Sequence, residues 1–448
     1  MNDLADQSDA LGSGQEPPRM RVPAPGPLSR AWLERSARVA APMGRAAPPG
    51  AALGATLVMS SGRGVNVLDV DGNRYVDLAA GFGALLLGHG HPSVLSALDH
   101  QSRTLLQALG DVYPSEAKIA LLERLTALYP ERAQVILAQS GSDAVSAALK
   151  TAVLHTGKPG VVAFGGAYHG LGYGPLASCG LRSSYREPFA EQLNPHVCFA
   201  DYPIDENRLD PVLAQVGKAL ARGTIGAILV EPILGRGGVI VPPPSFLPAL
   251  ARAARDSGAL LIADEIWTGL GRAGLPLVSL KTTLPDLICL GKGLGGGLPM
   301  SALVGRAEVM ASWRQANEVV HTATFAGAPL PAATALATLQ ALEVEQLVAR
   351  SARVGDRFRA RLQSRIASSY PGVIVRGSGL MIGIDLGARA GAGSALQTKL
   401  LERGYITSTG GGQREVLVLT PPLVIEESLL DMFTDHTLAA FGELGLGA

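Results

Sequence analysis

The feature that most constrains the fold is a series of short, uninterrupted apolar segments that alternates with helical segments from about residue 91 onward. The apolar segments read AQVILAQ, GVVAFG, IGAILVEP, GALLIADE, LICLGK and SALVG, and helical patterns such as SEAKIALLERLTALY lie between them. A strand that is apolar at nearly every position is buried on both faces, which is typical of a parallel sheet with helices on both sides. The sequence therefore predicts an α/β protein with a mostly parallel sheet.

The 448 residues divide into regions of different composition, because a chain of this length usually contains more than one hydrophobic core. The helical segment SRAWLERSARVAA is expected to begin with Ser29 as its cap, and GVNVLDVDGNRYVDLAAG to form a hairpin that turns at Asp71-Gly72. The polar lead before Ser29, rich in proline and glycine, is expected to be disordered. The expected regions are this lead (1–28), an N-terminal segment (29–90), a large domain (91–335) and a smaller C-terminal α/β domain (336–448).

Composition and charge argue against several classes of partner. Lys plus Arg equals Asp plus Glu at 38 each, and no basic cluster stands out, so neither nucleic acid nor a membrane is expected as a partner. The three cysteines are scattered without metal-ligand spacing, which predicts a reduced chain with no disulfide and no metal site. The polar N-terminus MNDLADQSDA does not resemble a signal peptide, and we expect a cytoplasmic protein.

Polar residues follow the apolar strands at the edge where a parallel sheet usually binds its ligand, beyond the carboxyl ends of its strands. Ser140-Gly141-Ser142 follows AQVILAQ and opens a helix, whose free N–H groups suit a phosphate, although ordinary helix capping explains the same residues. Tyr168 and His169 follow GVVAFG on a glycine-flanked turn, where a core aromatic is the simpler interpretation.

Three further strands end in charged residues, which are costly to bury unless they are paired. IGAILV ends at Glu231, GALLIA ends at Asp264, and LICLG ends at Lys292 among several glycines. The carboxylates alone could be helix caps. Together with the helix N-terminus and the aromatic residue, however, this combination is typical of a pyridoxal phosphate site. There a lysine forms the Schiff base because its pKa shifts readily on desolvation, and an aspartate keeps the pyridinium nitrogen protonated.

The order of these motifs resembles that of the class III (ω-type) aminotransferases of pyridoxal-phosphate fold type I, from about residue 68 to 423. The matching segments are DVDGNRYVDLAAG, GHGHP, SGSDAVSAALK, GAYHG, VEPILGRGG, LLIADEIWTGLGRAG, PDLICLGKGLGGGLPMSA, TFAGAP, VRGSGLMIGI and VLVLTPPL. The resemblance implies a large domain that binds pyridoxal 5′-phosphate and a smaller C-terminal α/β domain.

The resemblance also implies roles for individual residues. Lys292 would form the Schiff base and transfer the proton, Asp264 would pair with the pyridinium nitrogen, and Glu231 would steady the site. The implied cofactor contacts are Ser140, Gly141, Ser142, Tyr168 stacked on the ring, His169, Asp264, Ile266 on the other face of the ring, and Lys292. Thr324 would reach the phosphate from the other subunit of a homodimer with shared active sites. The glycine-rich turns at 81–90, with Phe82 as a substrate contact, would line the partner's pocket.

The sequence departs from the family pattern around the substrate. Trp267 stands where many members have a glutamine that binds the cofactor's 3′-oxygen, and Ala328 replaces an asparagine after Thr324. Arg236 and Val418 replace a glutamate and an arginine that usually form a pair. The side chain of Trp267 is therefore expected to form part of the wall of the substrate pocket. The substrate carboxylate, which favours a bidentate arginine, is expected at Arg236 or, as the second candidate, Arg414.

The function expected is transfer of an amino group from an amino acid or ω-amine, such as a 4-aminobutyrate-like donor, to a 2-oxo acid in two half-reactions. A racemase or epimerase of the same family, and a lyase, are the alternatives. GLGRAG at 269–274 matches a dinucleotide-binding fingerprint, but the prolines in LPLVSLKTTLP after it do not allow the helix that such a site needs.

Overall fold

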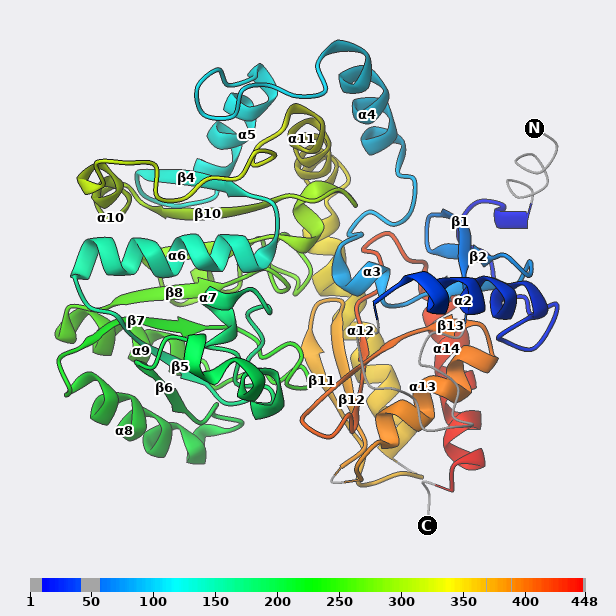
Figure 1. Cartoon of the computed structure of the whole chain (residues 1–448). Coiled ribbons are helices and arrows are strands. Elements are labelled where there is room, and N and C mark those ends of the chain that lie inside the picture. Colours follow the sequence, from blue (N-terminus) through cyan, green and yellow to red (C-terminus); the bar gives the residue numbers. More distant parts are fainter. Residues whose placement is uncertain (1–9, 42–56, 368, 388, 446–448) are drawn as a thin grey trace.

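The computed structural model describes residues 10–41, 57–367, 369–387 and 389–445. Figure 1 shows a large body, coloured cyan to yellow-green, beside a smaller one that combines the blue N-terminal and the orange and red C-terminal elements. Within these ranges no helix is long and apolar enough to cross a membrane.

The large domain contains a seven-stranded sheet in the order β4-β10-β9-β8-β7-β5-β6. Six strands run in the same direction, and only β10 pairs antiparallel with its neighbours, β4 and β9. The mostly parallel sheet predicted from the sequence is confirmed. Its strands are β4 (Ala133–Ala138), β5 (Gly160–Phe164), β6 (Val197–Ala200), β7 (Ile225–Val230), β8 (Leu260–Asp264), β9 (Leu287–Leu290) and β10 (Ser301–Arg306).

Helices cover both faces of this sheet, which explains why its strands are apolar throughout. Along β7, Leu229 joins the core formed with α6 (Gly141–Thr156), whereas Ile228 and Val230 join the core formed with α8 (Leu209–Leu220) and α9 (Phe246–Ser257). Further along the sheet, α5 packs on β4, and α11 packs on α4 and α5. The bounds of the remaining helices are α4 (Pro92–Thr104), α5 (Glu116–Thr126), α7 (Tyr173–Leu176), α10 (Ala307–Met310) and α11 (Pro329–Val344).

The C-terminal region forms an antiparallel sheet in the order β11-β12-β15-β14, with helices packed against it. These strands are β11 (Ile374–Ser378), β12 (Met381–Asp385), β14 (Ser408–Gly410) and β15 (Val416–Leu419). The helices are α12 (Leu347–Ala367), α13 (Ala392–Glu402) and α14 (Glu427–Glu443).

A third sheet joins the two ends of the chain. The expected hairpin is present as β2 (Asn66–Asp69) and β3 (Arg74–Asp77), with β1 (Met59–Arg63) beside β2. The short strand β13 (Tyr405–Ile406) pairs in parallel with β3. The N-terminal segment and the C-terminal domain, which we had separated, therefore share one sheet.

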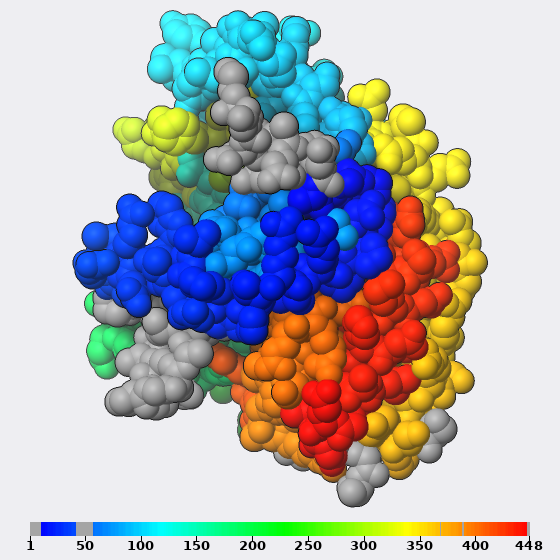
Figure 2. Space-filling view, turned by 90° about the vertical axis from the view of Figure 1, so that its right-hand side faces the viewer, coloured from blue at the N-terminus to red at the C-terminus, as the bar shows by residue number. Residues whose placement is uncertain are grey.

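Residues 10–28 differ from the disordered lead that we expected; residues 1–9 lie outside the described part of the chain. Arg19 exchanges two backbone hydrogen bonds of 2.8 Å with Arg74, and Oδ1 of Asn73 accepts from the N–H groups of Arg21 and Val22. The N-terminal segment (blue) consequently lies against the orange and red C-terminal elements in Figure 2. Composition misled the prediction because these hydrogen bonds come from residues distant in the sequence.

The helix expected to start at Ser29 is α2 (Pro27–Val39), and Ser29 is not its cap. Pro27 occupies the first helical turn, where its missing N–H costs nothing. The carboxylate of Asp71, in the hairpin turn, accepts instead from the N–H groups of Leu28 (2.7 Å) and Ser29 (2.9 Å). One turn residue thus fixes both the hairpin and the start of the helix.

Candidate active site

A cavity of about 210 Å³ lies beyond the carboxyl ends of five strands, β4, β5, β7, β8 and β9. It contains every strand-end residue that the sequence singled out, together with Gly170 of the GAYHG turn, which we had not named. The lining residues are Ser140, Gly141, Ser142, Tyr168, His169, Gly170, Glu231, Asp264, Ile266, Trp267 and Lys292.

Lys292 follows β9 and is enclosed by protein atoms around the cavity. Among the described residues it forms no hydrogen bond or ion pair, and its Nζ lies 4.7 Å from the centroid of the Trp267 ring. Burial lowers the pKa of this lysine, and the carboxylates of Asp264 and Glu231 oppose that effect in part. An amine with a lowered pKa is more often neutral, so it can act as a nucleophile or a base.

Asp264 ends β8 and is held in one orientation. Its Oδ2 lies 2.7 Å from Nδ1 of His169, and its Oδ1 accepts from the N–H of Ile266 at 3.1 Å. Both side chains are buried, and Nε2 of His169 has no partner among the described residues. The pair places a carboxylate at the base of the cavity where it can stabilise a positive charge.

Glu231 ties two loops together. Its two oxygens accept from the backbone N–H groups of Tyr168 (2.8 Å) and Gly235 (3.0 Å). Burial, reinforced by the charge of Asp264, raises the pKa of Glu231 to about 7, while His169 acts in the opposite direction. The two hydrogen bonds of Glu231 hold the backbone of Tyr168 and Gly235 in place.

The N-terminus of α6 forms one end of the cavity. The side chain of Ser140 caps the helix by accepting from the N–H of Asp143, whereas the N–H groups of Gly141 and Ser142 lack partners inside the helix. A Cβ added at Gly141 would lie 2.8 Å from Cδ1 of Ile266, so the backbone passes close to that side chain. Free N–H groups at a helix N-terminus suit a phosphate.

Tyr168 and Arg236 stack at the side of the cavity. The guanidinium carbon of Arg236 lies 4.5 Å from the centroid of the Tyr168 ring, and burial raises the pKa of the Tyr168 phenol, against an opposing effect of that guanidinium. Arg236 has no acidic partner in the described ranges and is half-buried. It is therefore available to bind an anion.

Four predicted site residues do not line this cavity. Thr324 is exposed, and its backbone oxygen accepts from Nε2 of Gln107. Arg414 is exposed in its loop. Arg236 lies beside the lining, through its contact with Tyr168. Phe82 is 68% exposed. Gly83, next to it, lies so close to Trp267 of the same chain that an added Cβ would be 2.4 Å from Nε1. This turn therefore borders its own cavity, whereas we expected it to line the partner's.

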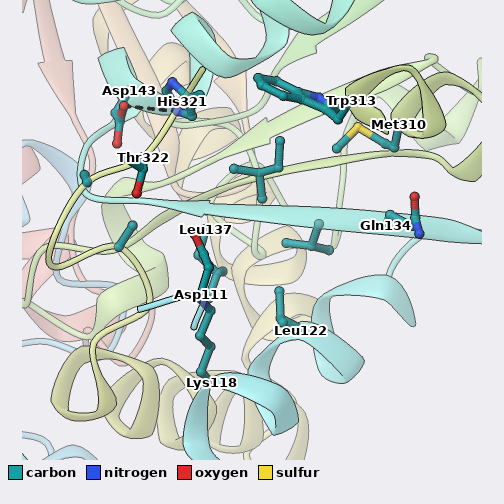
Figure 3. Close-up of a pocket in the computed structure, with 14 residues that line it drawn as sticks. Asp111, Lys118, Leu122, Gln134, Leu137, Asp143, Met310, Trp313, His321 and Thr322 are labelled. Carbon is teal, nitrogen blue, oxygen red and sulfur yellow. Dashed lines mark hydrogen bonds and ion pairs between the residues drawn. The ribbon is translucent and has the colours of Figure 1, made fainter. Parts of the chain in front are cut away.

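A second cavity, of about 400 Å³, is larger but lacks this chemistry. It lies against β4 and α5, and Figure 3 shows Lys118 beside Asp111 on one side and the pair His321–Asp143 on the other. Lys118 is already paired, with 2.5 Å between its Nζ and Oδ1 of Asp111. None of the strand-end residues around Lys292 lines it, so we assign the candidate active site to the smaller cavity.

The residues around Lys292 fit pyridoxal phosphate. The unpartnered N–H groups of Gly141 and Ser142 match the phosphate, the carboxylate of Asp264 matches the pyridine nitrogen, and the unpaired amine of Lys292 matches the aldehyde. One cavity thus contains groups that complement three different parts of the cofactor.

Comparison with known proteins shows which family and which proteins the chain resembles. Residues 50–441 match the family model described as aminotransferase class-III. The chain is 33% identical to the acetylornithine aminotransferase of Methanothermobacter thermautotrophicus, over 85% of this chain and 92% of that protein. It is 34% identical to the 4-aminobutyrate aminotransferase of Mycobacterium tuberculosis, over 97% of this chain and 100% of that protein. A pyridoxal-phosphate-bound amine transaminase from an uncultivated Pseudomonas species superposes with a TM-score of 0.82 at 30% identity, over 90% of this chain and 98% of that one.

Proposed function

Because the chain belongs to the class III aminotransferases, we propose that the cavity around Lys292 is where it transfers an amino group from an amino acid or ω-amine to a 2-oxo acid. The observation that carries this assignment is a half-buried lysine without an ion-pair partner that lines the same cavity as a fixed carboxylate, Asp264. The relatives compared above are all named aminotransferases or transaminases, and none favours the racemase alternative.

Pyridoxal phosphate, when bound, supplies an aldehyde that condenses with amines and a ring that withdraws electrons from the substrate's α-carbon. The protein positions that chemistry. The N–H groups of Gly141 and Ser142 would hold its phosphate, and Tyr168 and Ile266 would confine its ring. Asp264, oriented by His169, stabilises the positive charge on the pyridine nitrogen.

Lys292 then moves the proton. Its lowered pKa would allow the neutral amine to take the proton from the carbon that bears the substrate's amino group, and the resulting ammonium to release it again. Its opposing carboxylates, Asp264 and Glu231, keep the pKa from falling further, so the ammonium form needed for proton return also remains accessible.

Arg236 is the residue that we assign to the substrate carboxylate. Both relatives named above are called after amino donors that carry a carboxylate. Arg236 offers a bidentate guanidinium without an acidic partner, already oriented by the ring of Tyr168. Arg414 is exposed and outside the cavity lining, so it becomes the weaker candidate.

A homodimer that shares its active sites is the assembly we propose. Large apolar side chains are exposed on two neighbouring segments, 105–113 and 319–325, the second of which carries Thr324. Such exposed apolar patches usually mark an interface. Thr324 does not reach the cavity of its own chain, which supports contact with the partner's phosphate site.

The function is tested by following single half-reactions. Pure enzyme loaded with pyridoxal phosphate and mixed with an amino donor alone should lose the cofactor's visible absorbance once, in proportion to enzyme, and a 2-oxo acid should restore it. Continuous change in optical rotation without an acceptor would indicate a racemase instead. Lys292→Ala should abolish the covalent cofactor link that borohydride traps, whereas Lys281→Ala, at an exposed lysine, should retain it.

A further inference from the structure

The turn Ala80–Gly83, labelled α3, is left-handed throughout. The φ angles are 46° at Ala80, 58° at Gly81, 58° at Phe82 and 83° at Gly83. L-residues other than glycine rarely adopt this conformation, and two of the four have a Cβ. Such strain persists only where the surrounding structure enforces it, and it is concentrated at functional sites.

Asp77 enforces the entry into this turn. Its Oδ1 accepts from the N–H groups of Ala79 (3.0 Å) and Ala80 (2.8 Å), and its Oδ2 lies 2.9 Å from Nε2 of His89. Asp77 is 2% exposed, and the hydroxyl of Thr420 donates to the carbonyl oxygen of Ala79. A buried carboxylate with both oxygens engaged holds its partners in one geometry.

The other end of the turn rests on Trp267. A Cβ added at Gly83 would lie 2.4 Å from Nε1 of Trp267 and 3.6 Å from Cδ of Lys292. That indole N–H is buried and has no hydrogen-bond partner among the described residues. Gly83 therefore packs closely against the indole, next to the side chain of Lys292, and leaves no room for a Cβ between the turn and Trp267.

We propose that Asp77 is a positioning residue for substrate specificity: through the left-handed turn it locks Gly83 against Trp267 and thereby fixes the wall beside which the substrate approaches Lys292. The same turn carries Phe82, which precedes Gly83 and whose side chain is exposed. The proposal rests on the proposed function for its kinetic consequences, but the contact between the turn and Trp267 can be measured without any substrate.

Two glycine substitutions test the contact. Gly83→Ala and Gly81→Ala both place a Cβ on a left-handed residue, so both incur a similar backbone cost. Only the first creates a clash with Trp267, because a Cβ at Gly81 meets Leu85 at an ordinary 3.7 Å. In the holoenzyme, Gly83→Ala should raise the KM of the amino donor about tenfold, equivalent to about 1.4 kcal/mol, and Gly81→Ala should raise it much less. Equal effects would overturn the proposal.

A spectroscopic measurement separates this proposal from the proposed function. With Trp32 and Trp313 replaced by phenylalanine, the fluorescence of Trp267 should be poorly quenched by acrylamide, and Gly83→Ala or Asp77→Ala should expose it to the quencher. Unchanged quenching in both variants would refute the positioning role. If the parent enzyme transaminates nothing, the proposed function fails while this measurement still reports on the contact.

The role of Asp77 is tested by combining it with Phe82. Asp77→Ala should raise the KM of the amino donor in the parent enzyme but raise it little further in the Phe82→Ala background. The reason is that both substitutions alter the same turn. Asp77→Asn, which keeps an acceptor for the N–H groups, should restore much of the loss in KM. Additive effects, or no rescue by asparagine, would show that Asp77 serves folding alone.

Discussion

At the scale of single residues, Arg236 makes the clearest kinetic prediction. Arg236→Leu removes the unpaired guanidinium beside Tyr168 and should raise the KM for a 2-oxo acid about tenfold, since one charged hydrogen bond contributes about 1.5–3 kcal/mol. Half-reactions with an amine that lacks a carboxylate should change little. Arg414→Leu is the matched control, and a larger effect there would transfer the carboxylate site to Arg414.

Glu231 makes a prediction about pH and stability. Its folded pKa of about 7 exceeds the ordinary value of 4.5, so the folded chain holds a proton that the unfolded chain has already lost between these values. The unfolding free energy of the cofactor-free protein should therefore fall as pH rises from about 4.5 to 7, by about 3 kcal/mol from this group. Denaturant unfolding across this range should show a shallower slope for Glu231→Gln; an equal slope would contradict the assignment.

Those residues of the candidate site that directly follow a strand in the sequence could be predicted. Lys292, Asp264, Glu231 and the Ser140 turn end parallel strands, and the carboxyl ends of such strands meet at one edge. The stacking of Arg236 on Tyr168 could not be predicted, because it joins two loops whose relative position depends on Glu231. The left-handed turn was equally invisible, since Ala80 and Phe82 carry no preference for it.

At the scale of secondary-structure elements, two kinds of arginine hold the C-terminal region together. Arg357, Arg361 and Arg365, four residues apart on α12, pair with Glu427, Asp431 and Asp435 on α14. These pairs are largely exposed. Arg272 is instead buried in the turn after β8, where its guanidinium donates to the carbonyl oxygens of Leu380 and Pro421. Burial lowers the pKa of Arg272 to about 9.

Removing the two kinds of arginine should have different consequences. Arg361→Ala should cost less than about 1 kcal/mol, because exposed ion pairs contribute little. Arg272→Ala should cost several times more, because it leaves two buried carbonyl groups without a donor, each worth about 1–3 kcal/mol. Thermal unfolding of both variants checks this order, and comparable midpoints would show that Arg272 contributes no more than the exposed pairs.

The elements themselves were predicted unevenly. Apolar segments predicted six of the seven strands of the large sheet, and β6 (Val197–Ala200) was not among them. The direction of β10 was not predictable, because hydrophobicity records burial and not orientation. The GLGRAG segment, whose sequence matches a dinucleotide-binding fingerprint, forms the turn that carries Arg272. Its glycines serve close packing against the C-terminal region, where Gly274 approaches Ala352.

At the scale of the whole molecule, the proposed homodimer with shared active sites makes a prediction that involves two chains. Lys292→Ala lacks the lysine of its own site, and a Thr324 variant with weakened phosphate binding would damage only its partner's site. Mixed dimers of these two variants should therefore each hold one intact site. Activity should appear when the two poorly active proteins are mixed and allowed to exchange subunits. If no activity returns, Thr324 acts within its own chain or the sites are not shared.

The pairing of β3 with β13 has a consequence for the order in which parts of the protein fold during synthesis. Val76 lies early in the chain and Tyr405 near its end, yet they are neighbours in one sheet. During translation the β2–β3 hairpin leaves the ribosome long before β13 exists. Arg19 can already pair with Arg74, but the edge of β3 at Val76 and Asp77 stays open while the large domain is synthesised. Pairing of β13 with β3 is then a late folding step. A nascent chain stalled before residue 405 should have a folded large domain and an N-terminal sheet with an unpaired edge. Chaperones should bind such a chain.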